Sequence, residues 1–351
     1  IAWLKTIDYS DWTVFDNFGE IMLRLATPDR LRFVQADNFI ATFGGAEANV
    51  SVSLANYGEN AVFVSKVPEN EIGQAAINSL RQYGVGTSNV LRGGERLGIY
   101  FLETGASQRP SKVVYDRKYS SISAIQPGEI DWDKVLDDAT WFHFTGITPA
   151  LGDNVAEVTL EALKKCNEKG IMVSCDLNYR KKLWTREKAG KVMGELMQYV
   201  DLCIANEEDA DDVFGIKARG TDVVSGELNV AGYKDVAKQL ADRFGLKYVA
   251  ITLRESLSAD DNNWSAMLFD GNDYYFSRKY NVHIVDRVGG GDSFGGGLIY
   301  SLLNNYEPRE AIEFAVAASC LKHSIYGDYN QVTVNEVKTL MGGDGSGRVV
   351  R

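Results

Sequence analysis

Three consecutive glycines followed by an acid and a hydroxyl form the segment best suited to chemistry. Their order is Gly289-Gly290-Gly291-Asp292-Ser293, and an apolar run of helical period follows them. Asp292 and Ser293 are both good helix N-cap residues, so we expect the glycine amides to meet the positive end of a helix. Amides grouped in this way bind anions. A carboxylate beside such an anion cradle is what phosphoryl transfer to a hydroxyl requires, with a capped, tightly packed helix as the alternative.

The other common phosphate-binding and kinase motifs are not matched. Gly190-Lys191 is followed by Val192 and lacks the upstream glycine of a P-loop. The run 289–294 ends in Phe, where a dinucleotide-binding fingerprint needs a small residue. Ser-Phe-Gly at 293–295 is not the Asp-Phe-Gly of protein kinases, and no catalytic loop accompanies it. These patterns exclude P-loop, nicotinamide-dependent and protein-kinase functions.

Three more glycines lie inside the predicted helix, where glycine lowers helix stability. Residues 295–297 are all Gly inside the predicted helix, at a cost of about 1 kcal/mol each relative to Ala, so we expect another element to approach that face closely. A second glycine segment, residues 43–58, begins Phe-Gly-Gly and continues as a helix of small residues. Glu47 and Asn49 on this helix could offer polar groups to a ligand, or the helix could simply pack tightly.

Composition narrows the classes of function. The 351 residues include 48 acidic and 37 basic side chains, a net charge of −11, which disfavours nucleic-acid binding. No apolar run approaches the ~20 residues of a membrane span, and no secretory signal opens the chain. The four cysteines form no C-x-x-C pair and the three histidines are scattered, so zinc ligands are lacking. We expect a cytoplasmic protein without membrane or nucleic-acid partners.

Apolar β-branched runs alternate with segments of helical period, which is typical of βαβ units. The expected strands are 61–67, 141–145, 171–177, 200–205 and 248–253. The expected helices are 46–57, 71–83, 154–169, 185–199 and 231–244. The fold class is therefore α/β, a doubly wound and mainly parallel sheet flanked by helices.

One region interrupts the alternation. Residues 98–103 and 112–117 resemble two strands joined by a polar loop, with no helix between them, and 21–25 and 34–42 could pair with this hairpin. A small sheet standing off the main domain would form a lid over a site, a dimerisation surface, or both.

The domain boundaries follow from these patterns. We expect one domain over 18–340, with lid strands from about 21–42 and 97–123. Residues 1–17 would be a partly extraneous N-terminal segment, and 341–351, rich in Gly, a flexible tail.

Together the two glycine regions resemble the signatures of the ribokinase-like (PfkB) carbohydrate kinase family, in the same order, and the resemblance extends over residues 18–338. Within that family the sequence is most similar to 2-keto-3-deoxygluconate kinases, through segments 18–24, 115–117, 176–180, 252–256 and 321–330. Two positions depart from the family pattern. Arg287 replaces the usual Thr, a substitution associated with this sugar-acid branch, and the Asn-x-x-Glu motif here is Asn206-Glu-Glu-Asp209.

The resemblance implies a mechanism. Asp292 would take the proton from the primary hydroxyl of a keto-deoxy sugar acid as that hydroxyl attacks the γ-phosphorus of ATP. The amides of Gly289, Gly290 and Gly291 would hold the developing charge. Mg²⁺ would bridge the nucleotide phosphates.

The resemblance also implies the binding residues. Those for the substrate are Gly45, Ala46, Glu47, Asn49, Tyr100, Tyr115, Arg117, Arg180 and Asp328. Those for the nucleotide are Asn178, Arg180, Asn206, Thr252, Arg254, Gly289 and Gly291. Those that would act on the metal through water are Glu208 and Asp209, with Glu207 as a further candidate. Arg117 and Arg180 would supply the local positive charge that an anionic sugar needs in an acidic protein.

Three functions remain open at this level. The expected one is an ATP-dependent kinase of a keto-deoxy sugar acid that forms 2-keto-3-deoxygluconate 6-phosphate. A fructokinase or ribokinase of a neutral sugar is the first alternative, although it would give two buried arginines nothing to neutralise. A non-catalytic sugar-acid-binding protein is the second. A homo-oligomer, dimeric through the lid, is also expected from the resemblance.

Overall fold

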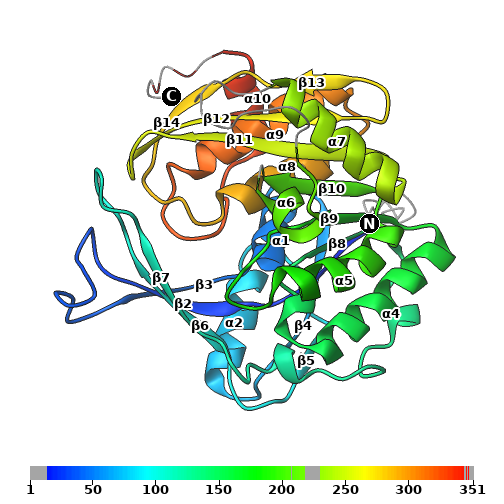
Figure 1. Ribbon diagram of the computed structural model, residues 1–351. Helices are drawn as coiled ribbons and strands as arrows, with labels where there is room; N and C mark the ends of the chain where they lie inside the picture. Colours follow the sequence, from blue (N-terminus) through cyan, green and yellow to red (C-terminus); the bar gives the residue numbers. More distant parts are fainter. Residues whose placement is uncertain (1–13, 207, 218–229, 344, 346, 348–351) are drawn as a thin grey trace, which may run out of the picture.

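A twisted, mainly parallel sheet forms the centre of the molecule (Figure 1). The computed structural model describes residues 14–206, 208–217, 230–343, 345 and 347. The order of the strands along the main sheet is β13-β12-β11-β10-β9-β8-β1-β4-β5, with β14 also paired to β12. Along this path every neighbouring pair from β5 to β11 is parallel. β12 is antiparallel to β11, and both β13 and β14 are antiparallel to β12. The doubly wound α/β class expected from the sequence is confirmed.

The strands of the main sheet have the following bounds. They are β1 (Val14–Phe18), β4 (Asn60–Val67), β5 (Val90–Arg92), β8 (Ala139–Thr145), β9 (Met172–Asp176), β10 (Leu202–Asn206), β11 (Tyr248–Ser256), β12 (Asp261–Phe269), β13 (Tyr274–Phe276) and β14 (Tyr280–His283). Five of them match the five apolar runs of the sequence to within a few residues.

Helices cover both faces of the sheet. The α-helices on one face, around a core that includes Phe15, Leu54 and Phe294, are α1 (Ala46–Asn56), α2 (Glu71–Arg81), α8 (Gly290–Leu303), α9 (Pro308–Lys322) and α10 (Val334–Met341). Those on the other face are α3 (Trp132–Val135), α4 (Asp153–Lys169), α5 (Arg186–Leu196), α6 (Asp209–Phe214) and α7 (Val230–Phe244). Among the described helices, none has the length and apolar character needed to cross a bilayer.

The expected N-terminal boundary is wrong by one strand. Residues 14–17 belong to β1, which lies between β8 and β4 in the middle of the sheet, and not to a segment outside the domain. The pattern concealed this strand because Asp16 and Asn17 interrupt its apolar run, yet their exposures are only 1% and 0%. The expected tail, 341–351, falls largely outside the described residues.

The lid is a separate four-stranded sheet in the order β3-β2-β6-β7. Its strands are β2 (Met22–Ala26), β3 (Ile40–Gly44), β6 (Gly98–Glu103) and β7 (Lys112–Asp116). The expected hairpin is β6 and β7, and β2 pairs with it through β6 as predicted. β3 pairs with β2 and not with the hairpin, and it covers only the end of the strand expected over 34–42. In Figure 1 this sheet projects from the main body. A small core that includes Met22, Tyr100 and Leu102 joins it to Val288 of the main domain.

Close helix packing accounts for two of the three glycines inside α8. A Cβ at Gly296 would lie 2.7 Å from the Cβ of Ser53 on α1, and one at Gly297 would lie 3.1 Å from the Cα of Ala315 on α9. At Gly295 the nearest atom would be at an ordinary 3.5 Å. The close approach expected from the sequence thus exists at the second and third positions.

Gly296→Ala should lower stability even though Ala favours helices, because Ser53 must shift to admit the methyl group. We expect a loss of about 1–3 kcal/mol in the free energy of unfolding, measured by urea denaturation. Gly194 on α5 is the matched control, since a Cβ there meets no atom within 4 Å. Gly194→Ala should stabilise by about 0.5–1 kcal/mol. A stabilised Gly296→Ala variant would contradict the packing argument.

Candidate active site

A cleft of about 440 Å³ lies between the lid and the carboxyl ends of β9, β10 and β11. Parallel α/β sheets bind ligands at this edge. The sequence-predicted residues that line the cleft are Gly45, Ala46, Asn49, Tyr100, Tyr115, Arg117, Asn178, Arg180, Asn206, Glu208, Asp209, Thr252, Arg254, Gly289, Gly291, Asp292 and Asp328. Of the described residues predicted for the site, only Glu47 and Gly290 do not line it.

The anion cradle begins one turn earlier than its sequence suggests. Gly289 is the N-cap of α8, with a left-handed φ of 82°, so Asp292 lies within the first turn and neither Asp292 nor Ser293 is the cap. A Cβ at Gly289 would lie 2.0 Å from the carbonyl oxygen of Asp328, which excludes any larger residue. The chain can therefore start the helix directly against the 328 segment.

Within the described chain, two of the three glycine amides of the cradle are free to bind a ligand, and the third is bonded to the backbone. In the part of the chain that the structure describes, the amides of Gly289 and Gly291 have no acceptor, and both residues line the cleft. The amide of Gly290 instead donates to the carbonyl of Arg287 at 3.3 Å. The expectation that all three glycines face the phosphoryl group is thus wrong for Gly290, because the turn into the helix uses its N–H.

Asp292 is held by the second glycine segment. Nδ2 of Asn49, buried in the first turn of α1, donates to Oδ2 of Asp292 at 2.6 Å. Burial raises the pKa of Asp292 to about 6, and the Asn49 hydrogen bond opposes that rise. The carboxylate is therefore ionised near neutral pH, yet it is more basic than an exposed Asp. These are the properties of a general base for a hydroxyl.

Glu47 does not reach the cleft. It is 1% exposed, and one of its carboxylate oxygens accepts hydrogen bonds from the amide and hydroxyl of Thr145 and from the hydroxyl of Thr148. Burial raises its pKa to about 7 although these bonds oppose the rise. The substrate-binding role expected for Glu47 is therefore wrong. Its side chain joins α1 to the segment that follows β8.

A buried ionic network, absent from the sequence-based site, supports the lid end of the cleft. Arg24 on β2 donates to Asp286 at 2.5 Å and to Asp328 at 2.6 Å. The hydroxyl of Tyr100 donates to the other oxygen of Asp328 at 2.5 Å. Asp328 thus lines the cleft with both oxygens already bonded to protein groups. The only indication of Arg24 in the sequence was its place in the segment 18–24 that resembles the family. Its burial could not be predicted, because it depends on the docking of the lid against Asp286 and Asp328.

Two arginines from different elements line the cleft. Arg117, just after β7, pairs with the carboxylate of Glu20 and lies over the ring of Tyr115, 5.4 Å from its centroid. Arg180 follows β9, is exposed, and donates within the described residues only to the carbonyl of Tyr179 at 3.4 Å. Arg180 is therefore the freer of the two cations.

The residues predicted for the nucleotide line the cleft in or just after β9, β10 and β11, and they include Asn178, Asn206, Thr252 and Arg254. Asn178 has a left-handed φ of 38°, a conformation that Asn tolerates better than most residues. Nine further lining residues were not among the predicted site residues, and they include Asp176, Trp264 and Arg287. Asp176 had a usable signal, because it ends an apolar strand at the ligand edge of the sheet.

The acidic residues of the cleft suit a hard divalent cation. Burial raises the pKa of Asp176 well above its usual range, and the nearby Asp209 and Asp292 raise it further. Burial likewise raises the pKa of Asp209, whose two oxygens accept the amides of Tyr179 and Asn206 at 3.1 Å each.

A bound cation would relieve this crowding of like charges. Glu208 lines the cleft and is exposed, whereas Glu207 lies outside the described residues. No group of three or more His, Cys, Asp or Glu among the described residues is placed to hold a metal alone. Mg²⁺ with substrate phosphates needs only one or two carboxylates.

Known proteins share this architecture over nearly the whole chain. A family model described as pfkB family carbohydrate kinase matches residues 16–334. The crystal structure of 2-dehydro-3-deoxygluconokinase from Thermotoga maritima is 52% identical, with a TM-score of 0.91 over 95% of this chain and 99% of that one. The 2-dehydro-3-deoxygalactonokinase of Haloferax volcanii is 31% identical over 328 residues, 93% of this chain and 96% of the relative.

A 2-dehydro-3-deoxygluconokinase from Thermoproteus tenax is 27% identical over 312 residues, 88% of this chain and 87% of the relative. With the cradle, the carboxylate and these matches in place, the chain belongs to the pfkB family of carbohydrate kinases. It is an enzyme that transfers a phosphoryl group from ATP to a sugar. This excludes the alternative of a non-catalytic binding protein.

The Asn49 bond to Asp292 should be visible in the pH profile of turnover. The base works only when ionised, so kcat/KM for the sugar should fall as the pH drops through about 6. Asn49→Ala removes a bond that lowers this pKa, and the acidic limb should move up by about one pH unit.

Asn56→Ala is the matched control on the same helix. Its side chain bonds the carbonyl of Asn330, not Asp292, so the limb should stay in place. An unmoved limb in Asn49→Ala would mean that Asp292 does not set the profile. The profiles come from ADP release measured from pH 5 to pH 8.

Proposed function

We propose that this kinase phosphorylates the primary hydroxyl of 2-keto-3-deoxygluconate, forming the 6-phosphate with ATP as the donor and Mg²⁺ as the metal. The observation that carries the proposal is the concentration of positive charge in the cleft of a chain of net charge −11. Arg117 and Arg180 line the same cleft as Asp292. A guanidinium binds a carboxylate in a bidentate way, which a sugar acid offers and a neutral sugar does not. The names of the relatives from Thermotoga and Thermoproteus support the same substrate.

The chemistry follows from the groups in the cleft. Asp292 takes the hydroxyl proton while the hydroxyl oxygen bonds to the γ-phosphorus, and the bond from that phosphorus to the β,γ-bridging oxygen breaks to release ADP. The amides of Gly289 and Gly291 donate to the oxygens of the moving phosphoryl group. Preorganised donors of this kind each contribute roughly 3 kcal/mol.

Mg²⁺ would neutralise phosphate charge during the transfer. Asp176 and Asp209 are the residues that would hold it, directly or through water, with Glu208 nearby. Because ATP is maintained in the cytoplasm, the proposal places the reaction there.

We also propose that the protein assembles as a dimer through the lid. Apolar side chains on the outer strands of the lid support this, because Ile40 on β3 and Val114 on β7 are 53% and 50% exposed. Exposed apolar groups clustered on one sheet are typical of protein contacts.

The direct test is ADP release measured with a panel of sugars. Turnover should be highest with 2-keto-3-deoxygluconate, lower with its galactonate epimer, and negligible with fructose and ribose. Asp292→Asn should abolish turnover while leaving ATP binding intact, because the amide cannot accept the proton. Comparable rates with fructose would favour a neutral-sugar kinase. Near-normal turnover in Asp292→Asn would remove the proposed base.

Arg180→Ala separates the sugar-acid substrate from the nucleotide. It should raise the KM for the sugar acid by roughly tenfold to a hundredfold, as expected for loss of a charge-assisted pair, and change the KM for ATP far less. Arg186→Ala is the control, since Arg186 is an exposed arginine that pairs with Asp212 on α6 and does not line the cleft. A larger rise in the KM for ATP would assign Arg180 to the nucleotide, and equal rises in both KM values would assign it to folding.

A further inference from the structure

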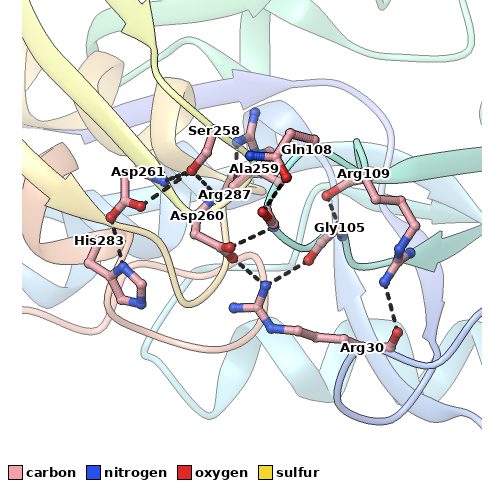
Figure 2. Close-up of polar contacts among 12 residues, drawn as sticks. Arg30, Gly105, Gln108, Arg109, Ser258, Ala259, Asp260, Asp261, His283 and Arg287 are labelled. Carbon is pink, nitrogen blue, oxygen red and sulfur yellow. Dashed lines mark hydrogen bonds and ion pairs between the residues drawn. The ribbon is translucent and has the colours of Figure 1, made fainter.

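The tip of the lid makes a second set of contacts with the main domain, outside the cleft (Figure 2). The turn between β11 and β12, residues 257–260, meets the loop between β6 and β7. The amide of Ser107 donates to Oδ2 of Asp260 at 2.7 Å, and the amide of Ala259 donates to the carbonyl of Ser107 at 2.7 Å. Arg30, on the loop between β2 and β3, pairs with the other oxygen of Asp260. Both lid loops therefore meet the main domain at one carboxylate.

The lid side of this contact is braced within the lid. Arg30 also donates to the carbonyl of Gly105 at 2.8 Å, so one guanidinium joins both loops. Arg109 donates to the carbonyl of Arg30 at 2.9 Å and pairs with the buried Glu103 at 2.8 Å. The loops thus form one unit, and Asp260 is the acidic side chain of the main domain that holds it.

The same turn is bonded to the segment that leads into the cradle. The amide of Ile284 donates to the carbonyl of Asp260 at 2.6 Å. Nη2 of Arg287 donates to the carbonyl of Ala259 at 3.0 Å, and Arg287 lines the cleft two residues before Gly289. Figure 2 shows Arg287 beside Ala259 and Asp260 of this turn. The turn is therefore fixed by the lid on one side and by the cradle segment on the other.

Charge supports the contact. The Ser107 amide, then the Arg30 guanidinium, lower the pKa of Asp260, which keeps this carboxylate ionised. Burial lowers the pKa of Arg287, and Arg254 across the same cleft lowers it further. Arg287 is therefore a partly buried cation that depends on the Ala259 carbonyl for its position.

We propose that Asp260 is a positioning residue that ties the lid tip to the turn holding Arg287, so that lid closure over the sugar and the position of the phosphoryl cradle depend on one another. The proposal rests on the sugar-kinase function above. Linkage is reciprocal, so occupancy of the nucleotide site must then change the affinity for the sugar by the same factor as the reverse.

Arg30→Met tests the proposal, with Lys279→Met as its matched control. Each substitution removes one partly exposed ion pair of the β11 to β14 region. The Arg30–Asp260 side chains are 41% and 20% exposed, and those of Lys279 and Glu255 are 47% and 27% exposed. Only the first pair reaches the lid. Neither cation lines the cleft.

The measurement is the Kd of 2-keto-3-deoxygluconate by calorimetry, with and without a non-hydrolysable ATP analogue, beside the KM for each substrate. In wild type and Lys279→Met the two Kd values should differ. In Arg30→Met their ratio should approach one, and the KM for the sugar acid and the KM for ATP should rise by a similar factor, roughly threefold to tenfold, while the melting temperature stays unchanged. Asp260→Asn should behave in the same way.

Three results would overturn the proposal. They are a wild-type ratio of one, a wild-type ratio retained in both Arg30→Met and Asp260→Asn, or an equal effect of Lys279→Met. If Arg30→Met does not fold, the near-isosteric Asp260→Asn gives the answer. If wild type fails to phosphorylate the sugar acid, the proposed function has failed instead, and the same titration is run with the sugar that supports ADP release.

Discussion

The hydrogen bond from Asn49 to Asp292 joins the two glycine segments of the chain, and the rest of the site depends on it. Asn49 lies in the first turn of α1 and Asp292 in the first turn of α8. The two helices approach so closely that Gly296 has no room for a methyl group beside Ser53. Close packing therefore places the carboxylate, burial makes it basic, and the same helix start supplies the amides of the cradle. One packing constraint thus accounts for the position, the pKa and the anion site.

The cleft contains a group of positive side chains although the chain as a whole is negatively charged. Arg117, Arg180, Arg254 and Arg287 line a cleft in a protein with eleven more acidic than basic side chains. Three acids of the cleft, Asp176, Glu208 and Asp209, lie near the ends of β9 and β10, where burial and mutual repulsion raise the pKa of Asp176. An anionic sugar and a metal-bound nucleotide require both cationic and anionic side chains in one cavity.

Most of the fold could be predicted from the sequence, because continuous apolar runs and helical periods are local signals. β1 was not predicted, because Asp16 and Asn17 make its sequence look polar, although the sheet buries both. The members of the site were predicted well, but the direction of a side chain is a tertiary property. Glu47 turns inward to two threonines, the amide of Gly290 is used by the turn into α8, and the burial of Arg24 exists only when the lid is docked on Asp286 and Asp328.

The contacts of Arg24 distinguish lid strands that are bonded to the main domain from a lid strand that, among the described residues, is not. The ion pairs of Arg24 hold β2 against the main domain, and Tyr100 holds β6 through Asp328, so these two inner strands form an anchored wall. β7 has no comparable bond among those described from its own residues to the main domain, and Tyr115 and Val114 on it are exposed. The sequence of β7 can therefore change without disturbing the ion pairs of Arg24 with Asp286 and Asp328. Diversification of the accepted sugars within such a scaffold has a natural place to occur, in the edge strand beside the anchored wall.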